Sequence, residues 1–191
     1  MNYRNPLPDL AYLRECFTYD PVSGILQWAN RPPHHFSSVS ECKRFTTTLC
    51  GREAGRLKKD GYREVRLNGV YYAVHRLCYY LSTGIEPECY VDHINGVKDD
   101  NRLSNLRLAN ETQNNHNRRI SRNNTTGYKG VSVDSKNNKF KSSIRVGNGT
   151  RIFLGYFNTA EEASLAYQEA ANKYHKEFAY TVDNQSNLRH T

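Results

Sequence analysis

The segment from residue 90 to residue 117 constrains the fold more than any other part of the chain. It starts with a short apolar-flanked run at 91–94, passes through a loop dense in Asp and Asn, and reaches a second apolar run at 106–108. Asn110, followed three residues later by Gln113, has the N-cap pattern of a helix. The segment therefore predicts a strand, a loop, a second strand and a helix in close succession.

The polar residues of this segment suggest a particular chemistry. Asp92 offers a hard anionic oxygen and Asn114 a carboxamide oxygen, which are the ligands that Mg²⁺ or Mn²⁺ prefers. His93, with an unperturbed pKa of about 6.5, is suited to act as a general base near neutral pH. These are the groups that hydrolysis of a phosphodiester at a single metal ion requires.

Two alternatives to this interpretation stay open. Short Asx side chains such as Asp92, Asn95 and Asn101 often bond to their own backbone in turns, without any catalytic role. In addition, His116 shares a helical turn with Asn114 and could replace it at the metal.

Residues 61–117 resemble the HNH homing-endonuclease family, a branch of the ββα-metal nucleases found in phages and mobile introns. The resemblance rests on segments in the family's order and approximate spacing: Val74-His75-Arg76-Leu77, Val91-Asp92-His93-Ile94-Asn95-Gly96, Asp100-Asn101-Arg102-Leu103, Asn105-Leu106-Arg107 and Gln113-Asn114-Asn115. It implies that Asp92 and Asn114 bind the metal, that His93 is the base, and that Asn105 holds the backbone around His93 and orients its ring. His75 is interpreted as a structural residue, with Arg76 near the scissile phosphate.

Residues 1–60 are interpreted as a β-rich segment of short strands and turns. Residues 24–28 predict a strand, 31–40 a Pro- and Ser-rich loop in which His34 and His35 are solvated, and 61–67 a strand that turns back at Asn68-Gly69. A helix is expected over 76–82.

Composition favours a polyanionic partner. The 191 residues have a formal net charge of +8, and a mean hydropathy of -0.82 favours several small modules over one large core. The five cysteines contain no C-x-x-C pair, which fits reduced thiols in a cytosol. No membrane segment or signal peptide is expected, so we expect a protein of the bacterial host cytoplasm, encoded by a phage.

The C-terminal part follows a basic linker at 118–127. Strands are expected over 128–133, 139–146 and 151–157, and then a helix with Thr159 as N-cap and Glu162 closing a capping box. Seven basic residues and one acidic residue lie between 121 and 157, whereas five acidic and two basic residues lie between 158 and 183. The positive charge is therefore expected on the sheet, and a β-ribbon fits the major groove of DNA.

Residues 128–183 resemble the AP2 DNA-binding domain, which reads DNA with a three-stranded sheet. The resemblance rests on Tyr128-Lys129-Gly130-Val131, Ile144-Arg145, Leu154-Gly155-Tyr156-Phe157, Thr159-Ala160-Glu161-Glu162-Ala163 and Ala166-Tyr167. Ser132 and Asp134 stand where plant members typically carry arginines, which leaves the target sequence open. The candidate DNA contacts are Arg118, Arg119, Arg122, Lys129, Lys139, Lys141, Arg145 and Arg151.

Together these features predict an α+β protein: a β-rich segment, a central ββα-metal module, and a three-stranded antiparallel sheet packed on one helix. The expected function is a site-specific, Mg²⁺- or Mn²⁺-dependent endonuclease of homing type that acts on double-stranded DNA. A monomer would nick one strand and a homodimer could cut both. The alternatives are a structure-directed DNA nuclease and a DNA-binding regulator with an inactive HNH fold.

Overall fold

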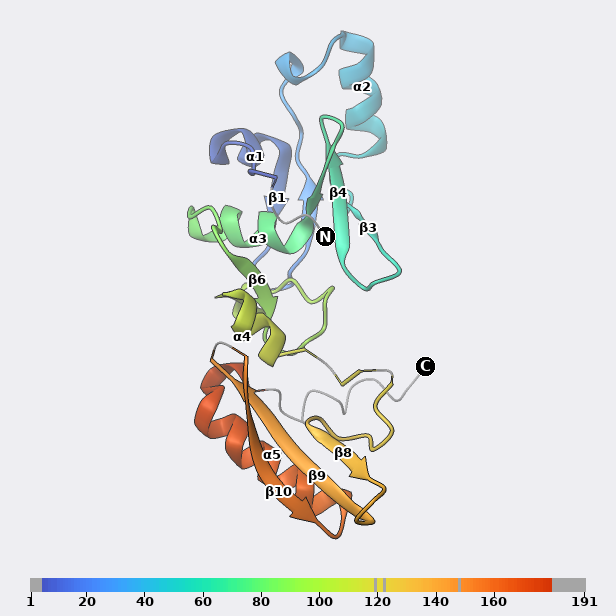
Figure 1. The fold of residues 1–191 in the computed structure, drawn as a ribbon. Coiled ribbons are helices and arrows are strands. Elements are labelled where there is room, and N and C mark those ends of the chain that lie inside the picture. The colour runs from blue at the N-terminus through green and yellow to red at the C-terminus, as the bar shows by residue number, and fades with distance from the viewer. Residues whose placement is uncertain (1–4, 119, 122, 148, 180–191) are drawn as a thin grey trace. The chain divides into compact units, whose positions relative to one another are not determined.

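The computed structural model describes residues 5–118, 120–121, 123–147 and 149–179 (Figure 1). The chain forms two compact units, Met1–Leu108 and Ala109–Thr191, and each contains helices and small sheets. The boundary falls inside the stretch 61–117 that the sequence resemblance treats as one module. No helix in the described part of the chain is long and apolar enough to cross a lipid bilayer.

The start of the first unit is more helical than the sequence pattern predicts. Its elements are α1 (Leu10–Cys16), β1 (Phe17–Tyr19), β2 (Leu26–Trp28), the 3-10 turn η1 (Pro33–His35) and α2 (Val39–Thr48). The prediction of a loop up to residue 40 was wrong, because Ser38 is the N-cap of α2 and its Oγ accepts a hydrogen bond from the Glu41 amide at 3.1 Å. Ser38 and Glu41 have the spacing of a helix start, which is the signal that would have identified α2.

The rest of the first unit follows the predicted pattern. The strands β3 (Arg56–Leu57), β4 (Arg63–Leu67) and β5 (Val70–Ala73) form one sheet, and β4 turns into β5 at Asn68-Gly69. Both turn residues have positive φ, 49° and 81°, as the tight hairpin turn requires. The helix α3 (Val74–Thr83) starts two residues earlier than expected.

The core of the first unit lies among α1, β1, β2, β4 and α3. Leu13, Leu26, Val65, Leu67 and Leu77 are each at most 2% exposed. Burial of this apolar surface from several elements fixes the position of the next two strands, β6 (Tyr90–His93) and β7 (Leu106–Ala109), which pair with each other. Val91 and Leu106 belong to the same core.

The second unit starts with the short helix α4 (Glu111–His116) and continues with a three-stranded antiparallel sheet. The sheet has the order β10-β9-β8 and is formed by β8 (Val131–Asp134), β9 (Lys139–Val146) and β10 (Thr150–Phe157). The helix α5 (Ala160–Tyr174) packs on one face of this sheet, and the 3-10 turn η3 (Lys176–Phe178) follows (Figure 1). The predicted capping box of α5 is present, and the predicted N-cap of α4, Asn110, forms a capping box with Gln113.

The faces of the second sheet agree with the sequence pattern. On β9, Ser142 and Ile144 are buried beneath α5, whereas Lys139 and Arg145 are exposed on the opposite face. On α5, Ala163, Ala170 and Ala171 are buried against the sheet, whereas Tyr174 at the end of the helix is 42% exposed.

Candidate active site

His93 lies at the end of β6 and is buried. The residue is 3% exposed, and its Nε2 lies 3.2 Å from Oδ1 of Asn101. Since a carboxamide oxygen can only accept, this contact places the proton of the neutral ring on Nε2. Burial lowers the pKa of His93 below its usual value, against opposing contributions from Asn101 and three nearby aspartates. The imidazole is therefore neutral at pH 7, which is the form that accepts a proton.

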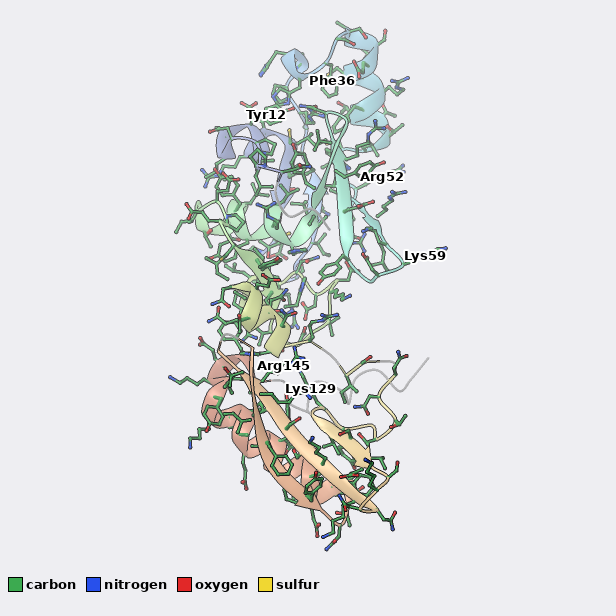
Figure 2. All side chains as sticks on the ribbon, in the orientation of Figure 1. Tyr12, Phe36, Arg52, Lys59, Lys129 and Arg145 are labelled. Carbon is green, nitrogen blue, oxygen red and sulfur yellow. The ribbon has the colours of Figure 1, made fainter. Side chains whose placement is uncertain are left out.

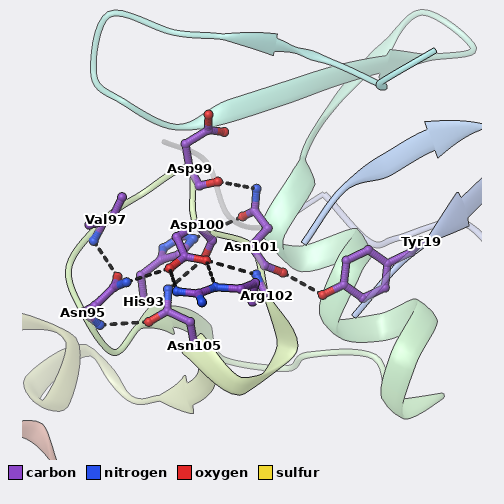
Figure 3. Close-up of polar contacts among 9 residues, drawn as sticks. All are labelled: Tyr19, His93, Asn95, Val97, Asp99, Asp100, Asn101, Arg102 and Asn105. Atoms are coloured by element: carbon purple, nitrogen blue, oxygen red, sulfur yellow. Dashed lines mark hydrogen bonds and ion pairs between the residues drawn. The ribbon is translucent and has the colours of Figure 1, made fainter. Parts of the chain in front are cut away.

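Asn105 closes the loop that follows His93 (Figure 3). Its Oδ1 accepts a hydrogen bond from the backbone amide of Asn95 at 2.9 Å, and its Nδ2 donates to the backbone carbonyl of Asp100 at 2.7 Å. Asn105 is 6% exposed, so both bonds are formed away from bulk water. The side chain thus ties together two points of the loop backbone, while the His93 ring is oriented by its bond to Asn101.

Charged groups fix the same loop from the outside. The carboxylate of Asp100 accepts hydrogen bonds from Arg102 at 2.7 and 2.6 Å and from Nδ2 of Asn95 at 2.7 Å. Asp99 receives a bidentate pair from Arg63, with distances of 2.9 and 3.1 Å. Pairs of this geometry are stronger than single ion pairs, so the loop is anchored to β4.

Asn101 links His93 to the N-terminal strands. Its backbone carbonyl accepts a hydrogen bond from the Tyr19 hydroxyl at 2.6 Å, and its Nδ2 donates to the Asp99 carbonyl at 3.3 Å (Figure 3). Gly24, with a φ of +78°, packs so closely that an added Cβ would lie 2.5 Å from the backbone nitrogen of Arg102. The β1–β2 hairpin therefore packs closely against the backbone of the loop that carries Asn101.

Asp92 is paired with an arginine that the sequence pattern did not single out. Nε and Nη2 of Arg107, on β7, both lie near Oδ2 of Asp92, at 3.0 and 2.9 Å. Asp92 is 7% exposed, so a buried carboxylate faces a cation on the neighbouring strand. A pairing of this kind was foreseeable, since β6 and β7 were predicted as neighbours and Arg107 is the basic residue of the second strand.

Aromatic rings form one wall of the site. The ring of His75 lies 5.1 Å from that of His93, and the ring of Tyr62 lies 6.0 Å from it. Neither nitrogen of His75 has a hydrogen-bond partner among the described residues, and burial lowers its pKa well below the usual value. Arg76 is 8% exposed and donates to the carbonyls of Asn5 and Pro87, which is a structural role; its place near the scissile phosphate stays a prediction.

Asn114 lies on α4, after the N-cap Asn110, and its backbone amide bonds to the Asn110 carbonyl at 2.9 Å. The helix belongs to the second unit, whereas Asp92 and His93 belong to the first. Joint binding of one metal ion by Asp92 and Asn114 therefore remains a prediction from the sequence.

His116, the alternative metal ligand, is engaged within the second unit. Its ring stacks on that of His175 with a centroid distance of 3.6 Å and an interplanar angle of 12°. Burial, with smaller contributions from His175 and Lys129, lowers the pKa of His116 to about 4. Lys129 donates to the carbonyls of His116 and Arg118 at 2.6 and 2.5 Å, which holds the end of α4.

The predicted DNA contacts occupy different environments. The ammonium of Lys129 bonds to backbone carbonyls, so this residue has a structural task that its place in the sequence did not reveal. Arg118, Lys139, Arg145 and Arg151 are exposed, and Lys141 lies on the same sheet face with its Nζ 5.7 Å from the Phe153 ring centre. Arg119 and Arg122 lie outside the described residues.

A second group of metal-binding side chains lies elsewhere in the first unit. Oε2 of Glu15 is 2.7 Å from Nε2 of His35 and 3.8 Å from Nε2 of His34. The prediction that both histidines are solvated was wrong for His35, whose side chain is 3% exposed. Arg31 donates to Nδ1 of His35 at 3.3 Å, so the proton of the neutral ring lies on Nε2, beside Oε2 of Glu15. We therefore regard the group as a structural contact.

Part of the chain is similar to known HNH endonucleases. Residues 72–116 match the model of the HNH endonuclease family. A curated relative, an uncharacterized HNH endonuclease of Acanthamoeba polyphaga mimivirus, is 39% identical over 108 residues, which cover 56% of this chain and 54% of that protein. This chain therefore spans about half the length of that relative.

A solved structure is also similar. The structure of DNA binding and cleavage by the HNH homing endonuclease I-HmuI aligns with 77% of this chain and 74% of that chain, at 20% identity and a TM-score of 0.34. A similarity at this level supports no conclusion about this chain. The family match ends at residue 116, so the AP2-like character of residues 128–183 remains a prediction.

Proposed function

We propose that this chain is a metal-dependent DNA endonuclease of homing type, with His93 as its general base. The observation that carries the proposal is a buried imidazole whose Nε2 lies 3.2 Å from Oδ1 of Asn101, inside the segment that matches the HNH endonuclease family. Such a ring needs no deprotonation before it acts at neutral pH.

The residues of the loop give His93 a fixed orientation. With its proton on Nε2, the ring presents Nδ1 in the form that removes a proton from water as the oxygen attacks phosphorus. Asn105 and Asp100 keep the loop backbone in place, so the ring does not have to be ordered when DNA binds. In this proposal Asn101 and Asn105 are positioning residues.

Asp92 and Asn114 would hold the metal ion. Their donor set, one carboxylate and one carboxamide oxygen, fits Mg²⁺ or Mn²⁺ better than zinc, which favours sulfur and imidazole. When bound, such an ion supplies positive charge that stabilises the phosphate and the departing oxygen. Arg107 donates two hydrogen bonds to Oδ2 of Asp92 and so orients that carboxylate.

The C-terminal unit would hold the DNA. Its sheet carries basic side chains on the face opposite α5, and in this proposal that face supplies most of the site recognition. The name of the mimivirus relative agrees with nuclease activity and says nothing of its target.

The test is cleavage of plasmid and phage DNA by the His93→Ala variant. We expect cleavage to fall by a factor on the order of 10² to 10⁴, with DNA affinity nearly unchanged. His34→Ala is the matched control, because that side chain is 71% exposed and outside the site. If His93→Ala cleaved DNA at the wild-type rate, His93 would not be the general base.

The same assay separates the alternatives. Cleavage that needs Mg²⁺ or Mn²⁺ and stops with a chelator would exclude a DNA-binding regulator with an inactive fold. Sequencing of the ends from a digested phage genome would then distinguish one defined site, as expected for homing, from cuts at junctions or broken ends.

A further inference from the structure

A basic pocket of about 730 Å³ lies in the second unit, between α4 and one end of the sheet. It is lined on the charged side by Arg118, Lys129, Arg145 and Arg151, and also by the stacked rings of His116 and His175. None of the described residues that line it is Asp or Glu. We call this hollow the basic pocket; Figure 2 labels Lys129 and Arg145 at its wall.

Two arginines of the basic pocket lie side by side on neighbouring strands of the sheet. Arg145 on β9 and Arg151 on β10 are direct cross-strand partners, so their side chains lie on the same face. Among the described residues, no carboxylate forms an ion pair with either guanidinium. Like charges in this arrangement destabilise a sheet, and an anion bound between them would offset that cost.

At the other end of β9, the basic residues have no basic cross-strand partner in the part of the chain that the structure describes. Lys139 has an acidic cross-strand partner, Asp134 on β8, although these two described side chains form no ion pair. Lys141 lies opposite Ser132 on β8 and Tyr156 on β10, with its ammonium over the Phe153 ring. The uncompensated charge of the sheet is therefore concentrated at the end that borders the basic pocket.

The rest of the lining suits a phosphate group. The hydroxyls of Ser132 and Ser143 belong to the lining and can donate to phosphate oxygens. An added Cβ at Gly147 or Gly149 would meet nothing within 4 Å, so the backbone there is open to close approach. The ammonium of Lys129 is already bonded to two carbonyls, and it contributes positive potential rather than a direct contact.

We propose that the basic pocket binds one backbone phosphate of duplex DNA, with Arg145 and Arg151 as its principal donors. The inference rests on the proposed function for its choice of ligand, and it goes beyond that function by assigning the strongest contact to one end of the sheet. Two forks of guanidinium donors on neighbouring strands can hold the oxygens of a single phosphate. The volume also leaves room for the sugars on either side.

The experiment measures binding of the full chain to a labelled duplex of random sequence. Fluorescence anisotropy is recorded over a series of salt concentrations, with a chelator present so that the DNA stays intact. Arg145→Gln and Arg151→Gln should each weaken binding by about tenfold. Because both arginines are assigned to one phosphate, the double variant with both changes should reduce the slope of log K against log salt by about 0.9 in total.

Two control variants define the result. Lys173→Gln removes one positive charge from α5, on the other side of the sheet, and should leave affinity and slope unchanged. Arg145→Lys and Arg151→Lys keep the charge, so the salt slope should be retained while the affinity falls with the loss of the bidentate contact. Amide hydrogen exchange on β9 shows that each variant is folded.

The same ligand chemistry could come from a free phosphate compound. Calorimetric titration with inorganic phosphate and with a nucleoside monophosphate distinguishes that source. Saturable binding of either one that Arg145→Gln abolishes, together with unchanged DNA binding, would overturn the proposal. Absence of such binding, with a reduced salt slope on DNA, supports it.

Cleavage assays separate this inference from the proposed function. If the wild-type protein cuts DNA while both glutamine variants bind with wild-type affinity and slope, the pocket assignment is wrong and the nuclease stands. If the wild-type protein fails to cut while the variants lose affinity and slope, the nuclease assignment is wrong and the pocket stands.

Discussion

Around His93 in the first unit, arginines are paired with carboxylates, whereas on the outer face of the second unit Arg145 and Arg151 face each other without an acidic partner among the described residues. Arg63, Arg102 and Arg107 bind Asp99, Asp100 and Asp92. The first arrangement holds a loop still, and the second leaves positive charge uncompensated until an anion binds. The difference indicates that substitutions in the first region reduce stability, while those in the second reduce DNA affinity.

Gly24→Ala should give the largest loss of stability. Its Cβ would lie 2.5 Å from the backbone nitrogen of Arg102, in addition to the strain of a φ of +78°. We expect the free energy of unfolding of the first unit to fall by about 3 kcal/mol. Urea unfolding followed by the fluorescence of Trp28, the single tryptophan, reports on this unit.

Gly51→Ala is the control for that substitution. Gly51 has nearly the same φ, +77°, but an added Cβ meets nothing within 4 Å. It should therefore lose only the cost of the backbone conformation, about 1 kcal/mol. Equal losses at both positions would show that the hairpin does not press on the loop.

Asn105→Ala comes next in size. It leaves the partly buried amide of Asn95 and carbonyl of Asp100 without their side-chain partners. We expect a loss of about 2 kcal/mol in the free energy of unfolding, and slower DNA cleavage because the loop after His93 loosens. Asn137→Ala removes one exposed bond, to Asp134, and should change stability by less than about 0.5 kcal/mol. A comparable effect of both variants would contradict the role of Asn105 in the loop.

The buried His75 should make the first unit sensitive to acid. Burial lowers its pKa well below 6.5, so below about pH 6.5 the unfolded chain binds a proton that the folded chain does not. The contribution of His75 to the free energy of unfolding is fully present above that pH. It decreases as the pH falls, by up to about 1.4 kcal/mol per pH unit. His75→Phe keeps a ring in the core and should remove that slope in Trp28-monitored unfolding between pH 6.5 and the acid limit.

A pH dependence of stability that His75→Phe leaves unchanged would assign the effect to another group. His34→Ala serves as the reference, because its exposed side chain contributes no burial cost.

Arg151→Gln should have the smallest effect on stability and the opposite sign. Removing one of two facing positive charges relieves repulsion with Arg145, so the second unit should gain about 0.2 to 1 kcal/mol. Hydrogen exchange of the β9 amides measures this gain. A loss of stability would mean that Arg151 stabilises the fold. It would contradict the difference drawn between the region around His93 and the outer face of the second unit.

Much of the local structure could be predicted from short-range patterns. The hairpin at Asn68-Gly69, the capping boxes before α4 and α5 and the two faces of β9 all depend on residues close in sequence. The helices α1 and α2 were missed because their N-cap signals, Asp9 and Ser38, stand in a segment that was interpreted as turns.

The candidate site was predicted in part. The sequence identified Asp92, His93, Asn105 and Asn114, but their roles depend on partners that are distant along the chain. Asn101 at the His93 ring and Arg107 at Asp92 were assigned no such contact. Lys129 was expected to contact DNA, but its ammonium donates to the His116 carbonyl at the end of α4.

The residue types and their order along the chain set the chemistry available to this protein: which side chains can bind a divalent ion, accept a proton or neutralise phosphate, and which strands and helices carry them. Which of these groups already have partners depends on how the chain packs. Burial and pairing depend on chain segments that the packing of a core brings together. The Tyr19 hydroxyl, for example, donates to the Asn101 carbonyl, and α5 covers one face of the sheet while Arg145 stays exposed on the other. The free energy of a charge depends on that surrounding more than on the residue type.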